Sequence, residues 1–110
     1  MLFISVDDFF VKVKDIPRLT KEKEKDLGYQ KHHGDTIARD ALIHGYLPFA
    51  AAFVRRAPDC VQTLSTVYAC IDCLEKSVDQ FDFSQNKETF PNYLGKRLRQ
   101  CITRCICDRY

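Results

Sequence analysis

The sequence predicts an all-α fold, a compact bundle of about five helices in one domain over residues 1–110. Three observations support this prediction. Apolar residues recur at helical spacing, most regularly from Leu64 to Phe81 and from Leu94 to Ile106. No segment alternates apolar and polar residues as a half-buried strand would. The connections between the periodic segments are short, which is typical of helix bundles.

Two helices are predicted in the first third of the chain. A short one is expected over Val6 to Val13. Thr20 can cap a second helix, because its hydroxyl can accept a hydrogen bond from an amide of the first turn. This helix should run to His33, where Gly34 can adopt the left-handed conformation that stops it.

A longer helix is predicted next. Asp35 can cap it, and its pattern continues through Arg56. Pro48 lies inside this helix and should kink or interrupt it, because proline lacks the amide hydrogen. The residues Ala-Pro-Asp at 57–59 form the following break.

The second half of the chain contains two helices that should pack against each other. The first, from Thr63 to Gln80, carries a stripe of apolar residues. The stripe consists of Leu64, Val67, Ile71, Leu74, Val78 and Phe81. A polar loop is expected over Phe83 to Glu88, and Thr89 can cap the last helix, whose first turn tolerates Pro91. The facing residues of that helix are expected to be Leu98, Ile102 and Ile106.

The last helix has two contrasting faces. Its apolar arc contains Leu94, Leu98, Cys101, Ile102 and Cys105. Its polar arc contains Lys96, Arg99, Gln100, Thr103 and Arg104, with Arg97 at the edge. Over residues 90–110, five cations stand against one anion, a local net charge of +4 in a chain whose net charge is +2. Amide and hydroxyl groups among arginines suit a nucleic-acid surface, but a basic patch that only confers solubility explains the charge equally well.

Six cysteines allow a metal or disulfide hypothesis, and Cys70-x-x-Cys73 could be half of a metal site. Both cysteine clusters lie inside helical patterns, however, and no turn with Gly or Pro is adjacent. We therefore expect reduced cysteines that pack as small apolar residues, and no metal or other cofactor. Cys107 falls on the polar arc and is a candidate reactive thiol.

The composition argues against enzymatic and membrane functions. The four glycines at 28, 34, 45 and 95 are isolated, so no glycine-rich phosphate loop is present. No apolar run is long enough to cross a bilayer, and the N-terminus lacks the layout of a signal peptide. We therefore expect a cytoplasmic protein that is not an enzyme.

The order of the residues in the last helix is more specific than its charge. Phe90-x-x-Tyr93 is followed by the run L-R-Q-C-I-T-R-C-I-C-D over residues 98–108. This resembles the promoter-binding helix of bacterial RNA polymerase sigma factors, whose housekeeping members read F-S-T-Y-A, a spacer, then I-R-Q-A-I-T-R-A-I-A-D. Similar agreement is found for G-D-x-x-A-R-x-x-L-I over residues 34–43 and for I-P-x-L-T-x-E-x-E over residues 16–24.

The resemblance implies a domain that recognises and melts the promoter minus-ten element. Gln100 and Thr103 then lie where the family reads a base pair, and Tyr93 where an aromatic ring stacks on a flipped base. Phosphate contacts would come from Lys96, Arg97, Arg99 and Arg104, and Phe90 belongs to the same DNA-binding set. The implied nucleic-acid partner is promoter DNA, partly single-stranded.

The resemblance also implies binding to the clamp of the beta-prime subunit of core RNA polymerase. The expected contact face on the preceding helix consists of Tyr68, Asp72, Glu75 and Asp79. An inhibitory anti-sigma protein could compete for it. Full sigma factors continue into a second, helix-turn-helix domain, which is absent from these residues.

Two departures separate this chain from the housekeeping pattern. Lys96 and Arg97 replace two tandem tryptophans, and S-T-V-Y-A-C over residues 65–70 replaces the polymerase-contact motif D-L-I-Q-E-G. The alternative hypothesis is therefore a helical interaction module of the same fold that binds polymerase or a regulator without reading DNA.

Overall fold

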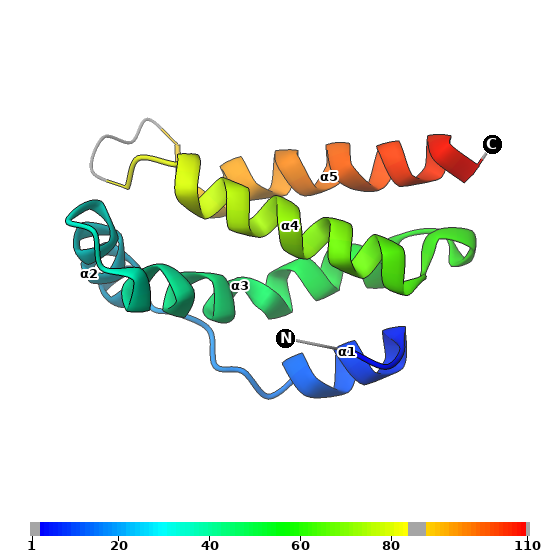
Figure 1. Cartoon of the computed structure of the whole chain (residues 1–110), viewed down its shortest axis with the longest axis horizontal. Coiled ribbons are helices and arrows are strands. Elements are labelled where there is room, and N and C mark those ends of the chain that lie inside the picture. Colours follow the sequence, from blue (N-terminus) through cyan, green and yellow to red (C-terminus); the bar gives the residue numbers. More distant parts are fainter. Residues whose placement is uncertain (1–2, 84–87, 110) are drawn as a thin grey trace.

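The computed structural model describes residues 3–83 and 88–109, which form five α-helices (Figure 1). These are α1 (Val6–Val13), α2 (Lys21–His32), α3 (Thr36–Arg56), α4 (Leu64–Gln80) and α5 (Phe90–Arg109), with a 3₁₀ turn, η1 (Asp59–Val61), before α4. Across the described ranges there is no strand, so the all-α prediction is confirmed.

Side-chain caps explain where the helices begin and end. The Thr20 hydroxyl accepts a hydrogen bond from the Lys23 amide at 3.1 Å, and the Asp35 carboxylate accepts one from the Ala38 amide at 3.2 Å. Gly34 has a φ of 89°, the left-handed conformation that ends α2. These two predicted caps and the predicted stop at Gly34 are confirmed, and the Thr89 hydroxyl, predicted to cap the last helix, accepts a hydrogen bond from the Asn92 amide at 3.4 Å. Pro48, by contrast, does not interrupt α3, which runs through it.

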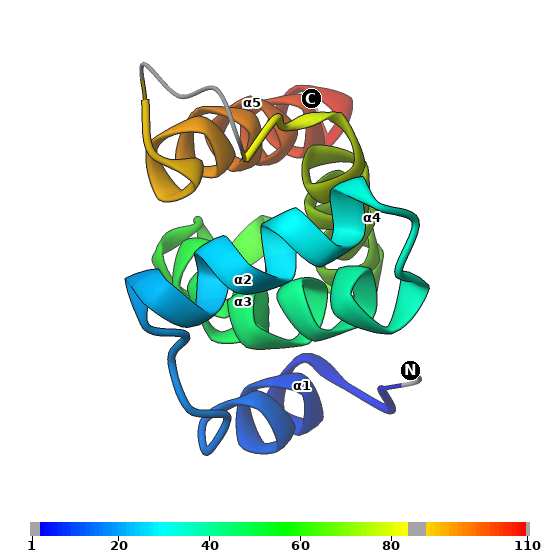
Figure 2. The same cartoon turned by 90° about the vertical axis from the view of Figure 1, so that its left-hand side faces the viewer.

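The helices form layers around α3. α4 packs against both α3 and α5, and α2 packs against α3. α1 lies on the far side of the bundle from α5, as both views show (Figures 1 and 2). None of these helices, over the residues described, has the length and apolarity that crossing a bilayer requires.

The stripe on α4 is mostly core. Val67, Leu74 and Val78 are fully buried. Ile71 is partly buried: it packs against this core and also lines a groove beside α3. Cys70, which is fully buried, instead fills the position toward α5.

An aromatic cluster holds the start of α5 against the rest of the bundle. The Phe90 ring lies 4.9 Å from Tyr46, 5.2 Å from Phe81 and 5.0 Å from Phe83 between centroids. A Cβ at Gly28 would lie 2.5 Å from the Phe83 Cβ, so only glycine lets α2 approach this ring. Phe83 therefore packs inside the bundle rather than in a polar loop, and residues 84–87 of that expected loop lie outside the described residues.

Candidate functional site

The outer face of α5 gathers five of the residues predicted to bind DNA. Lys96, Arg99, Gln100, Thr103 and Arg104 are all exposed. Leu94, Leu98 and Ile102 lie on the opposite side of the helix and are buried. The predicted amphipathic arrangement is confirmed, and the helix presents cations, an amide and a hydroxyl together to solvent. We call these five residues the α5 basic face.

Most of the positive charge on the α5 basic face is not neutralised within the described part of the molecule. Lys96 pairs with Glu88 at 3.2 Å, and both side chains are more than a third exposed. Arg99 and Arg104 make no ion pair within residues 3–83 and 88–109. Exposed guanidinium groups without an internal partner are available to bind phosphate or another anion.

Arg97 lies at the edge of this face, as predicted, and it covers Tyr93. Its guanidinium carbon is 5.7 Å from the centre of the Tyr93 ring, and its Nη1 donates to the Tyr93 hydroxyl at 3.4 Å. The other contacts of Tyr93 include Phe81, at 5.1 Å between ring centroids. Tyr93 is therefore half-buried, and Arg97 would have to move for a base to stack where it now sits.

Phe90 was expected within the DNA-binding set, but the structure places it beneath the surface. Its side chain is only 2% exposed. It supports the start of α5 from inside and can act on a nucleic acid only through the position of Tyr93, one turn away.

Sequence reasoning missed a hollow between α3 and α5. This hollow of about 390 Å³ has Phe49 and Phe53 on the α3 side, and Arg56 and Arg99 at its rim. Gly95 borders the hollow on the α5 side, and a Cβ there would make only ordinary van der Waals contact with the Phe53 ring, at 3.6 Å. The spacing Phe49-x-x-x-Phe53-x-x-Arg56 places the three side chains on one helix face and could have indicated the site. The hollow adds two partly exposed rings and a further arginine beside the α5 basic face.

Two acidic residues of α4, Asp72 and Asp79, are exposed but engaged, whereas Glu75 is partly buried. Asp72 pairs with Lys76, one turn along the same helix, at 3.0 Å. Asp79 accepts two hydrogen bonds from Arg39 of α3, from Nε at 2.5 Å and from Nη2 at 3.0 Å. The Arg39 hydrogen bonds hold the pKa of the Asp79 carboxyl below its usual value, and the positive charges of Arg39 and Lys31 add to this effect.

Tyr68 also has a structural partner. Its hydroxyl accepts a hydrogen bond from the Phe3 amide at 2.9 Å, and the two ring centroids lie 6.3 Å apart. The side chain remains about one-third exposed. Tyr68 thus holds the N-terminal segment against α4 while presenting one edge to solvent.

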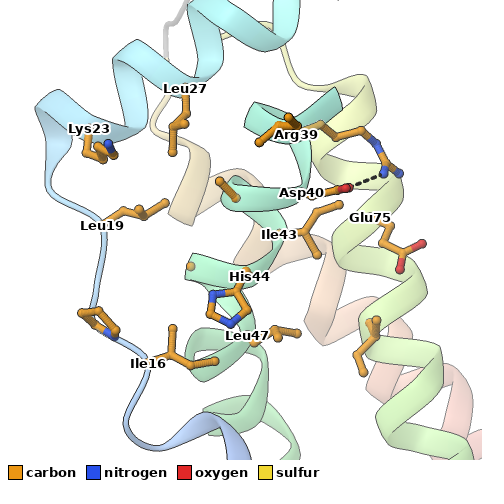
Figure 3. Close-up of a pocket in the computed structure, with 15 residues that line it drawn as sticks. Ile16, Leu19, Lys23, Leu27, Arg39, Asp40, Ile43, His44, Leu47 and Glu75 are labelled. Carbon is orange, nitrogen blue, oxygen red and sulfur yellow. Dashed lines mark hydrogen bonds and ion pairs between the residues drawn. The ribbon is translucent and has the colours of Figure 1, made fainter. Parts of the chain in front are cut away.

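Glu75 borders a larger groove formed by α2, α3, α4 and the segment before α2 (Figure 3). The groove has a volume of about 820 Å³. Leu27 comes from α2, Ile43 and Leu47 from α3, and Glu75 from α4, with Arg39 beside it at the rim (Figure 3). An apolar groove with charged groups at its rim suits a helix or peptide of a partner protein. Of the four residues predicted to bind polymerase, Glu75 is the one that faces this groove.

All six cysteines are free thiols. Within the described ranges, no group of three or more His, Cys, Asp or Glu side chains is placed to share a metal ion. Cys101 and Cys105 lie on the inner side of α5, as predicted, and Cys107 is exposed. Among the described residues, α5 thus presents exposed cations, and an apolar groove lies beside α4.

No known family model matches the chain, and no solved structure is significantly similar to it.

Proposed function

We propose that this chain is a sigma-factor-like transcription-initiation domain that binds core RNA polymerase and recognises and melts the promoter minus-ten element. The observation that carries the proposal is the α5 basic face. There, Gln100 and Thr103 stand exposed between Arg99 and Arg104, and neither arginine is paired within the described residues. A cytoplasmic location and a non-enzymatic role belong to the same proposal.

Side chains of this face and beside it have roles that fit their chemistry. Arg99 and Arg104 neutralise phosphates and fix the register of the helix on DNA. The Gln100 amide can pair with an adenine through two hydrogen bonds, and the Thr103 hydroxyl can reach the same base edge. Tyr93 stacks on a flipped base after Arg97 swings away from its ring and onto a phosphate.

The polymerase-binding part of the proposal rests on the groove of Figure 3 and on Glu75 at its border. A helix of the polymerase clamp would lay its apolar side over Ile43 and Ile71, with a basic residue opposite Glu75. Asp79 contributes by holding Arg39 in place rather than by direct contact. An anti-sigma protein would compete for this groove.

Binding to forked promoter-like DNA tests the DNA-reading part. Fluorescence anisotropy should show tighter binding to a fork carrying a minus-ten sequence than to a scrambled fork. Gln100→Ala should reduce that preference at one base pair by about 1–3 kcal/mol, the value of a bidentate contact. Gln30→Ala, an exposed glutamine on α2, is the matched control and should leave the preference intact. Equal binding of wild type to both forks would reject base reading by α5.

A second candidate is favoured by the two departures from the family pattern and by the size of the groove. In this alternative, the domain binds polymerase or a regulator through the groove and does not read DNA. This alternative predicts that the protein co-purifies with core polymerase and that it binds DNA with the same affinity whatever the DNA sequence. The same anisotropy series therefore separates the two candidates.

A further inference from the structure

Two aromatic rings lie next to each other on the side of α3 that faces α5. Phe49 and Phe53 are one helical turn apart, and their ring centroids lie 5.3 Å from each other. Both side chains are partly exposed, and both line the hollow of about 390 Å³ between the two helices. Because the core does not enclose these rings, each has surface left for a flat ligand to pack against.

The charged groups that border this hollow leave it positive. Arg56 of α3 and Arg99 of α5 are exposed, and neither forms an ion pair within residues 3–83 and 88–109. Lys96 also borders the hollow and pairs with Glu88, the one carboxylate among its described lining residues, at 3.2 Å. The two unpaired guanidinium groups, one on each wall, therefore favour an anionic ligand.

Gly95 of α5 leaves space opposite the rings. A Cβ at this position would lie 3.6 Å from the Phe53 ring and 4.0 Å from the Phe49 ring, which is ordinary contact with both. The further atoms of a longer side chain would have to occupy the hollow or displace the rings. Glycine at residue 95 thus preserves a space that a larger residue would fill.

We propose that this hollow holds one unpaired base of single-stranded DNA, packed against Phe49 and Phe53, with neighbouring phosphates bound by Arg56 and Arg99. The flat face of a base suits the rings, and the phosphates suit the unpaired arginines. The volume lies at the lower end of ligand pockets, about 300–1,000 Å³, which suits a single nucleotide unit. The proposal rests on the proposed function, because promoter melting would supply the unpaired base.

Continuity with the α5 basic face favours a nucleic-acid strand as the occupant. Lys96 and Arg99 belong to that face and also border the hollow. A strand whose phosphates lie along α5 can therefore place an unpaired base in the hollow without a break in its contacts. The rings contact the face of the base rather than its edge, so this site should accept any base, unlike the contact proposed for Gln100.

Binding of fluorescein-labelled oligothymidylate to the full chain, measured by anisotropy, tests the proposal. This probe has unpaired bases but no minus-ten element. The control ligand is an abasic oligomer of the same length, which carries the same phosphates and no bases. We expect wild type to bind oligothymidylate at least about fivefold more tightly, the lower limit for one stacked base. Equal affinity for the two oligomers would overturn the proposal.

Ring variants locate the base. Phe53→Leu keeps an apolar side chain but removes the flat ring, so it should weaken oligothymidylate binding at least about fivefold and leave abasic binding unchanged. Phe53→Tyr keeps the ring and should bind as wild type does. Phe10→Leu is the matched control, since Phe10 of α1 is also partly buried and lies beside an arginine, 4.8 Å from the guanidinium carbon of Arg55. Wild-type affinity in Phe53→Leu, or equal weakening for both oligomers, would overturn the proposal.

Filling the hollow tests it with both rings in place. Gly95→Leu introduces a better helix former and extends into the hollow, so it should weaken oligothymidylate binding about as much as Phe53→Leu does. Gly95→Ala adds only a Cβ in ordinary contact with the rings and should bind nearly as wild type does. If Gly95→Leu binds oligothymidylate like wild type, no base lies between α5 and the rings.

Two adjacent arginines test the phosphate contact. Arg56→Gln should reduce the slope of log affinity for oligothymidylate against log salt by about 0.7, the share of one phosphate on a single strand. Arg55→Gln removes the same charge from the next residue, but the Arg55 guanidinium lies over the Phe10 ring of α1, so the slope should change less. Equal changes in the two variants would contradict phosphate binding by Arg56.

The outcomes separate this site from base reading by α5. Gln100→Ala should leave oligothymidylate affinity unchanged, and Phe53→Leu should weaken binding to minus-ten and scrambled forks alike. If wild type binds both forks equally but its oligothymidylate affinity depends on Phe53, base reading fails and the hollow stands. The opposite pair of results rejects the hollow alone. A peptide of alternating glutamate and phenylalanine should not displace oligothymidylate, and displacement as efficient as that by unlabelled oligothymidylate would identify an acidic peptide as the occupant instead.

Discussion

The outer faces of α4 and α5 both carry charge of mainly one sign, but the structure uses them differently. On α4, Asp79 is bound by Arg39 of α3, and Asp72 is bound by Lys76 of the same helix. On α5, the guanidinium groups of Arg99 and Arg104 have no ion-pair partner within the described residues. A charged face is therefore available to a partner only when its charges are not already satisfied inside the fold. By this criterion the α5 face is left open for the partner that we propose, whereas Asp72 and Asp79 on the α4 face are already paired within the fold.

The inner faces of the two helices differ as well, and the largest effect we predict lies there. Leu98 of α5 is fully buried, so Leu98→Ala should lower the free energy of unfolding by roughly 2–5 kcal/mol. Ile71 of α4 is partly exposed in the groove, so Ile71→Ala should cost only about 1–2 kcal/mol. Urea denaturation of both variants measures the difference. Equal losses would mean that Ile71 contributes as much to the core as the fully buried Leu98.

The proposed DNA-binding role of α5 predicts the next effect. Arg99→Gln should weaken binding to all DNA sequences alike and reduce the slope of log affinity against log salt by about 1, the share of one phosphate contact. Lys14→Gln removes the same charge from an exposed site at the end of α1, on the far side of the bundle (Figure 1), and should barely change the slope. A similar change of slope in both variants would mean that DNA binding depends only on the net charge of the protein.

Local chemistry made much of the fold predictable, but contacts between distant segments did not follow from it. Thr20, Gly34 and Asp35 mark helix ends through hydrogen bonds and dihedral angles that depend on a few neighbouring residues. The pairing of Arg39 with Asp79 joins residues 40 positions apart, and no periodicity in the sequence indicates it.

For the candidate site too, the sequence predicted the local features but not the contacts with distant segments. Helical periodicity separates the exposed side chains of α5 from its buried ones, which identified Arg99, Gln100 and Arg104 as surface residues. It could not show that Phe49 and Phe53 of another helix complete the neighbouring hollow. It also could not show that Phe90 points inward, because its position depends on rings from α3 and from the segment after α4.

Glu75 is the exception on the acidic face of α4, because it forms no ion pair within the described residues and borders the groove. Glu75→Lys should therefore weaken co-purification with core polymerase severalfold, as expected for a charge at the rim of an interface. Asp7→Lys, which makes the same change of charge on an exposed residue of α1, is the control. If the two variants bind polymerase equally well, the groove is not the polymerase site.

The smallest effects we predict concern the two paired carboxylates of α4, beginning with Asp79. Its side chain is 47% exposed, so water screens the pair with Arg39, and Asp79→Asn should cost at most about 1 kcal/mol of stability. Because the folded-state pKa is lowered from 3.8, the stabilisation is present above pH 3.8 and is lost as pH falls through the lower folded-state value. Thermal melts of wild type and Asp79→Asn should therefore differ at pH 6 and converge in strong acid. Asp72→Asn removes only a pair within one helix and should cost less, about 0.3–0.5 kcal/mol. If Asp79→Asn destabilises no more than Asp72→Asn, the acidic face of α4 does not hold the bundle together and again becomes a candidate surface for polymerase.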